Sequence, residues 1–155
     1  MNKYNLNQLR YLESYFDVSE YNAFLKLINP SCSCYKIEIL ARAFQMGIDI
    51  TDLVDCNVNP DCLILLCDSK MKGIDIKGLG NELIDAKLLN EIISIKKKNP
   101  NQDLSFIVDL TKEQCMSFVD DYRFYGTRYF EKYREDVNLG RAKLEAELEF
   151  IQKNK

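Results

Sequence analysis

The sequence contains no histidine among its 155 residues. Histidine is the usual general base of enzymes, the commonest metal ligand and the partner of nucleophilic serine or cysteine, so its absence removes each of these arrangements. Proline and glycine are also scarce, with three and six residues, which leaves little room for linkers or disordered segments. We therefore expect a single folded domain over residues 1–155.

The sequence also lacks long apolar runs. One of the longest, from Cys62 to Cys67, is far too short to cross a bilayer. The N-terminal sequence MNKYNLNQLRYLE has no apolar core of the kind found in signal peptides. The net charge is −3 and both signs are spread along the chain, which argues against a DNA mimic and against a generally basic nucleic-acid binder. These features predict a cytoplasmic protein with no membrane partner.

The six cysteines do not have the spacing of a metal site or a disulfide framework. No Cys-x-x-Cys pair occurs, and no histidine can complete a mixed zinc site. A reducing compartment disfavours disulfides, so Cys67 and Cys115, which lie among apolar residues, are predicted to be small core side chains. No phosphate-binding or other catalytic motif is present. We therefore predict a protein that is not an enzyme, without catalytic residues, metal or cofactor.

A four-residue sequence, Gly-Ile-Asp-Ile, occurs at residues 47–50 and again at residues 73–76, which is 26 residues later. A leucine follows three places after each copy, at Leu53 and Leu79. A third copy over residues 89–107 fits if two residues are inserted in its loop. A period of 26 to 28 residues is typical of proteins that stack one supersecondary unit on the next.

Each copy is predicted to be a short helix followed by a turn. Gly47 and Gly73 are expected to end helices in the left-handed conformation, which glycine adopts without steric cost, and Asn99 to do so in the third copy. The aspartates that follow, Asp49 and Asp75, are expected to accept hydrogen bonds from nearby backbone amides in the turn. The first copy has apolar residues at i, i+3, i+4 and i+7, one face of a helix: Ile37, Leu40, Ala41 and Phe44.

Residues 47–51, Gly-Ile-Asp-Ile-Thr, followed by Asn-Pro-Asp at residues 59–61, carry a family resemblance. They resemble a loosely defined group of tandem short-helical-repeat proteins from Firmicutes and their mobile elements, in which a helix ends in Gly-Leu-Asp-Val-Ser or similar. Residues 73–76 are a second instance, although Lys77 replaces the Ser or Thr, and the third copy lacks the glycine. The resemblance covers residues 37–109. It implies a helical scaffold and a mobile-element origin, and it brings no catalytic activity.

These patterns predict an all-α fold in three parts. Residues 1–30 are expected to form an N-terminal helical cap, residues 31–110 about three stacked repeats of 26 to 28 residues, and residues 111–155 two longer C-terminal helices. Thr111 and Gln114 have the spacing of a capping box, which predicts where the first of these two helices begins.

An alternative fold contains a small parallel sheet, with strands at residues 62–67 and 104–110. The phase of the repeat favours helices over this alternative. The last helix is expected from about Asn138 and to pack along its neighbour, because its apolar residues share one stripe: Leu144, Leu148 and Ile151.

Residues 122–134 are the strongest functional candidate. They hold six of the 17 aromatic residues and three of the six arginines, with four basic residues against one acidic residue. One buried helix face cannot use so many rings, so some are expected to face outward. Exposed Tyr and Arg are frequent at interface hot spots, and they also stack on bases and pair with phosphates. The predicted partner-binding residues are Arg123, Tyr125, Arg128, Tyr129, Lys132 and Arg134.

A purely structural role for this segment is the competing interpretation. In that case three of its rings, Tyr122, Phe130 and Tyr133, would pack on the last repeat while the arginines pair with acidic residues. We predict a non-catalytic protein-binding module, a phage- or mobile-element-encoded inhibitor of a host defence complex of the anti-CRISPR type, acting in the host cytoplasm. The alternative is an accessory protein that contacts RNA or DNA through the Tyr- and Arg-rich segment. The sequence predicts no oligomeric state.

Overall fold

The structure is a computed structural model, and it describes residues 18–28, 32–54 and 57–153. It divides into two compact units, Met1–Ile76 and Lys77–Lys155. Within the described residues all regular secondary structure is helical, which confirms the all-α prediction. The alternative sheet is wrong, because residues 62–67 lie inside an α-helix and residues 105–109 form a 3-10 helix. Of the predicted N-terminal cap, residues 1–17 and 29–30 lie outside the described residues.

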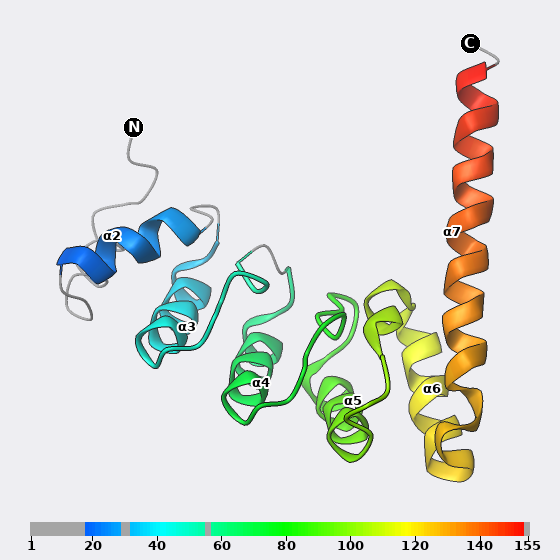
Figure 1. The fold of residues 1–155 in the computed structure, drawn as a ribbon, viewed down its shortest axis with the longest axis horizontal. Coiled ribbons are helices and arrows are strands. Elements are labelled where there is room, and N and C mark those ends of the chain that lie inside the picture. The colour runs from blue at the N-terminus through cyan, green and yellow to red at the C-terminus, as the bar shows by residue number, and fades with distance from the viewer. Residues whose placement is uncertain (1–17, 29–31, 55–56, 154–155) are drawn as a thin grey trace. The chain divides into compact units, whose positions relative to one another are not determined.

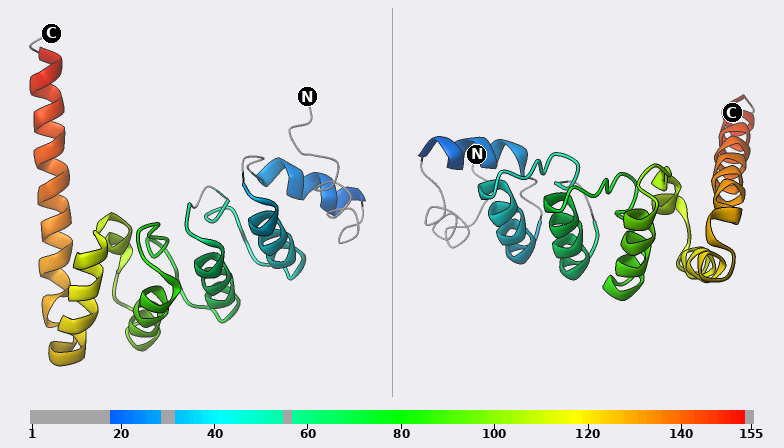
Figure 2. Two further views of the ribbon diagram at one scale, coloured as in Figure 1. Left: turned by 180° about the vertical axis from the view of Figure 1, so that it is seen from behind. Right: turned by 60° about the horizontal axis from the view of Figure 1, so that its bottom comes forward.

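The first unit contains α2 (Val18–Leu27), α3 (Cys34–Gln45) and α4 (Pro60–Met71). Helices α3 and α4 pack side by side, as Figure 1 and Figure 2 show. Side-chain hydrogen bonds fix the conformation of the loop between them. Asp49 Oδ1 accepts hydrogen bonds from the Thr51 backbone N–H at 3.0 Å and from its hydroxyl at 2.7 Å. Lys70 Nζ, on α4, donates to the Asp49 carbonyl and to Asp52 Oδ1.

The second unit contains α5 (Ala86–Lys98), the 3-10 helix η1 (Ser105–Asp109), α6 (Lys112–Tyr125), the 3-10 helix η2 (Gly126–Tyr129) and α7 (Phe130–Lys153). Helices α5 and α6 pack together. The predicted capping box is confirmed, since the Thr111 and Gln114 side chains each accept from the other residue's backbone N–H. The long C-terminal helix is also confirmed, although it begins at Phe130 rather than near Asn138.

A buried asparagine joins the loops of the second unit. Asn81 is 1% exposed, and its Nδ2 donates to the carbonyl oxygens of Ile107 and Leu110, each at 2.8 Å. Its Oδ1 accepts from the Leu83 N–H at 2.8 Å. Nδ2 also lies 3.7 Å from Cys115 Sγ. A buried amide with these four partners holds η1 and the start of α6 against the segment before α5, because a change in their spacing would break buried hydrogen bonds.

The helices recur at a constant interval. Helices α3, α4, α5 and α6 begin at residues 34, 60, 86 and 112, so successive starts are 26 residues apart. In each case the residue before the helix accepts a hydrogen bond from the backbone N–H three positions later. These four N-cap residues are Ser33, Asn59, Asp85 and Thr111.

The helix ends are less uniform than the starts. Gly47 and Gly73 have φ angles of 84° and 79°, the left-handed conformation predicted for both. The same prediction for Asn99 is wrong, since its φ is −129°. The Asn99 side chain instead donates from Nδ2 to the Ile95 carbonyl at 2.9 Å and to the Tyr122 hydroxyl at 3.0 Å. Side-chain hydrogen bonds therefore end α5 where a left-handed residue ends α3 and α4.

Candidate partner-binding surface

The Tyr- and Arg-rich segment does not continue α6 as one helix. Gly126 adopts φ 63° and ψ −135°, a combination that is essentially restricted to glycine. After Gly126 the chain forms η2 and then α7. In the second unit η2 contacts both α6 and α7. This turn separates the six rings of the segment into an inner group and an outer group.

The inner group belongs to the core of the second unit. Phe130 and Tyr133 pack against Phe118, with ring centroids 5.1 and 5.4 Å away. Tyr122 stacks on Phe130 at 5.9 Å. The Tyr133 hydroxyl donates to Asp121 Oδ2 at 2.7 Å, and burial together with this carboxylate raises the pKa of Tyr133 well above its usual value. For these three rings the structural interpretation is the better one.

The outer group consists of two exposed rings, Phe124 and Tyr125, and the half-buried ring of Tyr129. Phe124 and Tyr125 expose 75% and 53% of their surface. The Tyr125 ring meets Tyr129 edge to face, with centroids 5.2 Å apart. Arg128 Cζ and Lys132 Nζ lie 5.7 and 5.9 Å from the centroid of the Tyr129 ring, within cation–π range. We call these five residues, Phe124, Tyr125, Arg128, Tyr129 and Lys132, the outer aromatic surface.

The four basic residues of the segment have different electrostatic surroundings. Arg123 lies 3.7 Å from Asp120, a long and exposed ion pair. Arg134 pairs with Glu131, and its Nη2 donates to the Asp103 carbonyl at 2.8 Å. Arg134 also lies over the Phe106 ring, at 5.7 Å. Arg134 is thus engaged in holding α7 to η1, and it is the predicted binding residue least available to a partner.

Arg128 and Lys132 differ from the other two. Within the described part of the chain, neither cation has a carboxylate within ion-pair distance. Both are solvent exposed and share one aromatic ring. Two cations held close together without a neutralising anion form a local positive potential that favours a negatively charged group on a partner.

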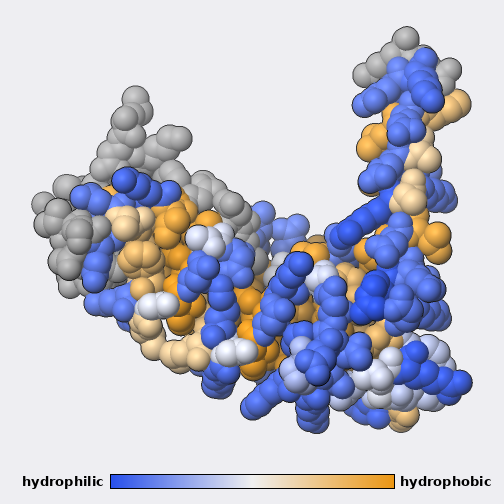
Figure 3. Space-filling view, in the orientation of Figure 1, coloured by the Kyte–Doolittle hydropathy of each residue, from blue (hydrophilic) through white to orange (hydrophobic). Residues whose placement is uncertain are grey.

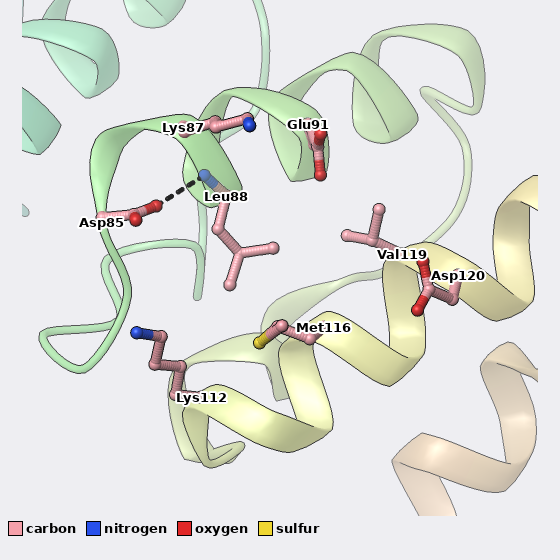
Figure 4. Close-up of a pocket in the computed structure, with 8 residues that line it drawn as sticks. All are labelled: Asp85, Lys87, Leu88, Glu91, Lys112, Met116, Val119 and Asp120. Carbon is pink, nitrogen blue, oxygen red and sulfur yellow. Dashed lines mark hydrogen bonds between the residues drawn. The ribbon is translucent and has the colours of Figure 1, made fainter.

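Two grooves lie between α5 and α6, beside this surface. One of about 550 Å³ is lined by Ser94, Lys98, Tyr122, Arg123 and Gly126, among others. The other, of about 300 Å³, is drawn in Figure 4, where Leu88, Met116 and Val119 form its apolar part. Charged residues of both signs surround that apolar part: Asp85, Lys87, Glu91, Lys112 and Asp120.

The linings of both grooves combine charged and apolar side chains. No group of three or more cysteine, aspartate or glutamate side chains is placed to hold a metal ion in the described ranges. The grooves offer shape and mixed charge, which suit binding of a peptide or a side chain.

Comparisons of the chain with protein-family models, curated proteins and solved structures gave no match. Among the helices that the structure describes, none is long and apolar enough to pass through a bilayer.

Four of the six predicted residues lie on the outer aromatic surface, Arg123 and Arg134 lie outside it, and Phe124 was not predicted. The missed signal was the phase of α6. Cys115 and Phe118 define the buried face of that helix, and at about 100° per residue Phe124 points well away from it. An aromatic residue off the buried face of an amphipathic helix is a candidate for an interface.

Proposed function

We propose that this protein is a non-catalytic binding module built on a tandem helical repeat. The constant 26-residue interval between helix starts, with the same N-cap hydrogen bond at each, supports a repeat. On this proposal α3, α4 and α5 begin the predicted repeats, α6 starts in the same phase, and α2 is the described part of an N-terminal cap. Repeat scaffolds of this kind commonly present an extended surface to a partner.

The outer aromatic surface carries the proposal of partner binding. Phe124 and Tyr125 are exposed, Tyr129 is half-buried, and the two cations have no carboxylate partner within the described residues. Exposed Tyr beside Arg is the composition of energetic hot spots. Binding costs this surface little conformational entropy, because the Tyr125 and Tyr129 rings already pack against one another.

A protein partner fits this surface better than a nucleic acid. A nucleic-acid backbone is recognised by a continuous cationic track. Here five acidic residues lie within the same stretch of α6 and α7 as Arg123, Arg128 and Lys132, and they interrupt any such track: Asp120, Asp121, Glu131, Glu135 and Asp136. A short acidic segment of a protein can reach the two unpaired cations without running past these carboxylates.

The biological setting is part of the proposal. We infer a phage- or mobile-element-encoded inhibitor, of the anti-CRISPR type, that acts in the host cytoplasm by covering a surface of a defence complex. The support is the resemblance of the Gly-Ile-Asp-Ile segments to mobile-element repeat proteins, together with the exposed aromatic and basic residues of the outer aromatic surface.

Affinity capture from the native host tests the binding surface. The bait is the full chain, either unchanged or carrying Tyr125→Ala, Arg128→Ala and Tyr129→Ala together. Lys143→Ala, an exposed position on α7 outside the surface, is the matched control. A protein retained by the unchanged chain and by the control, resistant to nuclease, and lost with the triple variant is the expected result.

Two outcomes would contradict the proposal. Retention of the same partner by the triple variant would remove the outer aromatic surface from the interface. Loss of the partner on nuclease treatment, with binding that weakens steeply between low and moderate salt, would instead identify a nucleic-acid accessory protein, because phosphate-dominated binding releases counterions.

A further inference from the structure

The last two thirds of α7 lie outside the core of the second unit, and an ion pair between Arg141 and Asp109 joins them to it. From residue 138 to residue 153 every residue is exposed, and Figure 1 shows this part of the helix continuing beyond the rest of its unit. The predicted packing of this helix along a neighbour is therefore wrong. We call residues 138–153 the distal helix. Isolated helices of this length are only marginally stable in water, so its stability depends on what covers it.

The distal helix carries an apolar stripe that continues a packed one. Phe130 is buried and Val137 is half-buried where α7 lies against the core. The same helical phase continues through Leu144, Leu148 and Ile151, each of which exposes half or more of its surface. Figure 3 shows hydrophobic residues among hydrophilic ones along this part of the helix.

Arg141 marks the point where the stripe leaves the core. It lies on the same side of α7 as Leu144 and Leu148, and it pairs with Asp109 at the end of η1. The ion pair fixes which side of α7 faces its own unit. Beyond it the apolar spacing is unchanged, although the chain itself supplies nothing to cover it within the described residues.

The edges of the stripe are acidic. Glu145 follows Leu144 and Glu147 precedes Leu148, so at about 100° per residue the two carboxylates border opposite edges. Neither has an ion-pair partner among the described residues. A helix that covers the stripe would place its own flanking residues against these two carboxylates.

A second copy of the chain is a poor occupant. Antiparallel pairing that sets Leu144 against Leu148 of the other copy also sets Glu145 against Glu145 and Glu147 against Glu147. Parallel pairing sets Arg141 against Arg141. Like charges directly opposed across a coiled-coil seam are destabilising and select against that pairing.

We propose that the distal helix docks one amphipathic helix of a partner protein, whose apolar face is flanked by lysine or arginine. The apolar stripe supplies the buried contact, and Glu145 and Glu147 select the basic flanks by charge complementarity. Three large side chains bury only a few hundred Å² on each partner, below the roughly 600 Å² a side at the low end of stable interfaces. The contact is therefore weak by itself and depends on salt. It is separate from the outer aromatic surface.

A synthetic helix tests this proposal directly. The probe is a fluorescent peptide of about three heptads with leucine at positions a and d and lysine at e and g. A second peptide has the same leucines and glutamate at e and g. We expect the full chain to bind the lysine peptide at least tenfold more tightly than the glutamate peptide, measured by fluorescence anisotropy at low salt.

Two variants separate the apolar contact from the charges. Leu144→Gln with Leu148→Gln keeps both carboxylates and is expected to lower the affinity for the lysine peptide at least tenfold. Glu145→Lys with Glu147→Lys keeps the leucines and is expected to reverse the preference between the two peptides. Helicity measured by circular dichroism shows that each variant is folded. Tyr129→Ala alters the outer aromatic surface and should leave peptide binding to the distal helix unchanged. Partner capture therefore tests the proposed function, and peptide binding tests this inference separately.

Three results would overturn the inference. Equal binding of both peptides would remove the charge selection. Unchanged binding after loss of the two leucines would show that the peptide merely associates with acidic residues. A dimer in analytical ultracentrifugation that Leu148→Gln dissociates would identify a second copy as the occupant.

Discussion

Gly78 is held against a neighbouring backbone, whereas Gly47, Gly73, Gly126 and Gly140 have no atom within 4 Å of an added Cβ. Its φ is +76°, and a Cβ added there would lie 2.2 Å from Ser105 Cα and 2.3 Å from the Ser105 carbonyl oxygen. Both are backbone atoms at the start of η1, so no side-chain rotation can relieve the overlap. Gly78→Ala therefore requires either that η1 moves or that the backbone at residue 78 gives up its left-handed conformation.

The expected loss of stability follows from three terms. A left-handed conformation costs an alanine about 1–2 kcal/mol. Forcing a methyl group into a packed position costs about 1–3 kcal/mol, while the stiffer unfolded chain returns about 0.4–1 kcal/mol. Gly78→Ala should therefore lower the free energy of unfolding by about 2–4 kcal/mol.

Two other glycines are matched controls. Gly73 has a φ of +79° with no atom within 4 Å of an added Cβ, so Gly73→Ala isolates the conformational term and should cost about 1 kcal/mol. Gly140 lies inside α7 with the same open surroundings and no left-handed angle. Gly140→Ala should raise stability by about 0.5–1 kcal/mol, because alanine is the better helix former.

Urea unfolding followed by circular dichroism measures these changes, and hydrogen exchange of the α5 and α6 amides assigns them to the second unit. The reasoning fails if Gly78→Ala is no more destabilising than Gly73→Ala. It also fails if Gly140→Ala destabilises α7.

Three further predictions concern buried and hydrogen-bonded groups. Asn81→Ala should lower the free energy of unfolding by about 2–4 kcal/mol in urea titrations, since it leaves the buried Leu110 carbonyl without its side-chain donor and removes the hydrogen bonds to Ile107 and Leu83; a loss under 1 kcal/mol would contradict this. Burial raises the pKa of the Cys115 thiol to about 11, so at pH 8 iodoacetamide should modify Cys115 far more slowly than the part-exposed Cys32, and comparable rates by mass spectrometry would refute it. Hydrogen bonds from Ser105 lower the pKa of Asp103 below its unfolded value. The stabilisation from Asp103 is therefore present above about pH 4 and is lost as pH falls through the folded pKa. Asp103→Asn should slightly reduce the loss of unfolding free energy on acidification, because the group is almost fully exposed, and an unchanged pH dependence would argue against the assignment.

The parts of the fold that the sequence predicted are those governed by local chemistry. The capping box at Thr111 and the left-handed residues at Gly47 and Gly73 need only a few neighbouring residues to be recognised. Asn99 was mispredicted because its side chain found a tertiary partner, the Tyr122 hydroxyl. A hydrogen bond between residues 23 positions apart has no local signature in one sequence.

The candidate surface was predicted in composition but not in arrangement. The aromatic and basic content of residues 122–134 indicated outward-facing rings, and Phe124 and Tyr125 are indeed highly exposed. The division into inner and outer rings depends on the turn at Gly126. Helical periodicity in the sequence does not predict that turn. The uncovered stripe at Leu144 and Leu148 was missed for a different reason. Periodicity shows that one side of a helix is apolar, and it does not show whether the same chain covers it.

The two helix pairs of the chain share one framework and differ at the surface. A shift of 52 residues takes the α3–α4 pair onto the α5–α6 pair, and the buried Leu66 of α4 then corresponds to the buried Phe118 of α6. The groove of the first pair, about 260 Å³, is lined by Tyr35, Ile39, Met46, Ile64 and Met71. The same shift replaces these residues with Lys87, Glu91, Lys98, Met116 and Arg123, which line the grooves of the second pair.

Positions that determine the helix framework are therefore separate from positions that determine what each groove can bind. The N-cap and core positions keep their chemistry through the shift, because every helix needs its first amides satisfied and one face buried. At four of the five groove positions an apolar side chain is replaced by a charged one, and Ile64 is replaced by the apolar Met116. An apolar groove and a charged groove select different ligand groups. The groove of the first unit thus presents mainly apolar side chains, and the grooves of the second unit present charged side chains of both signs.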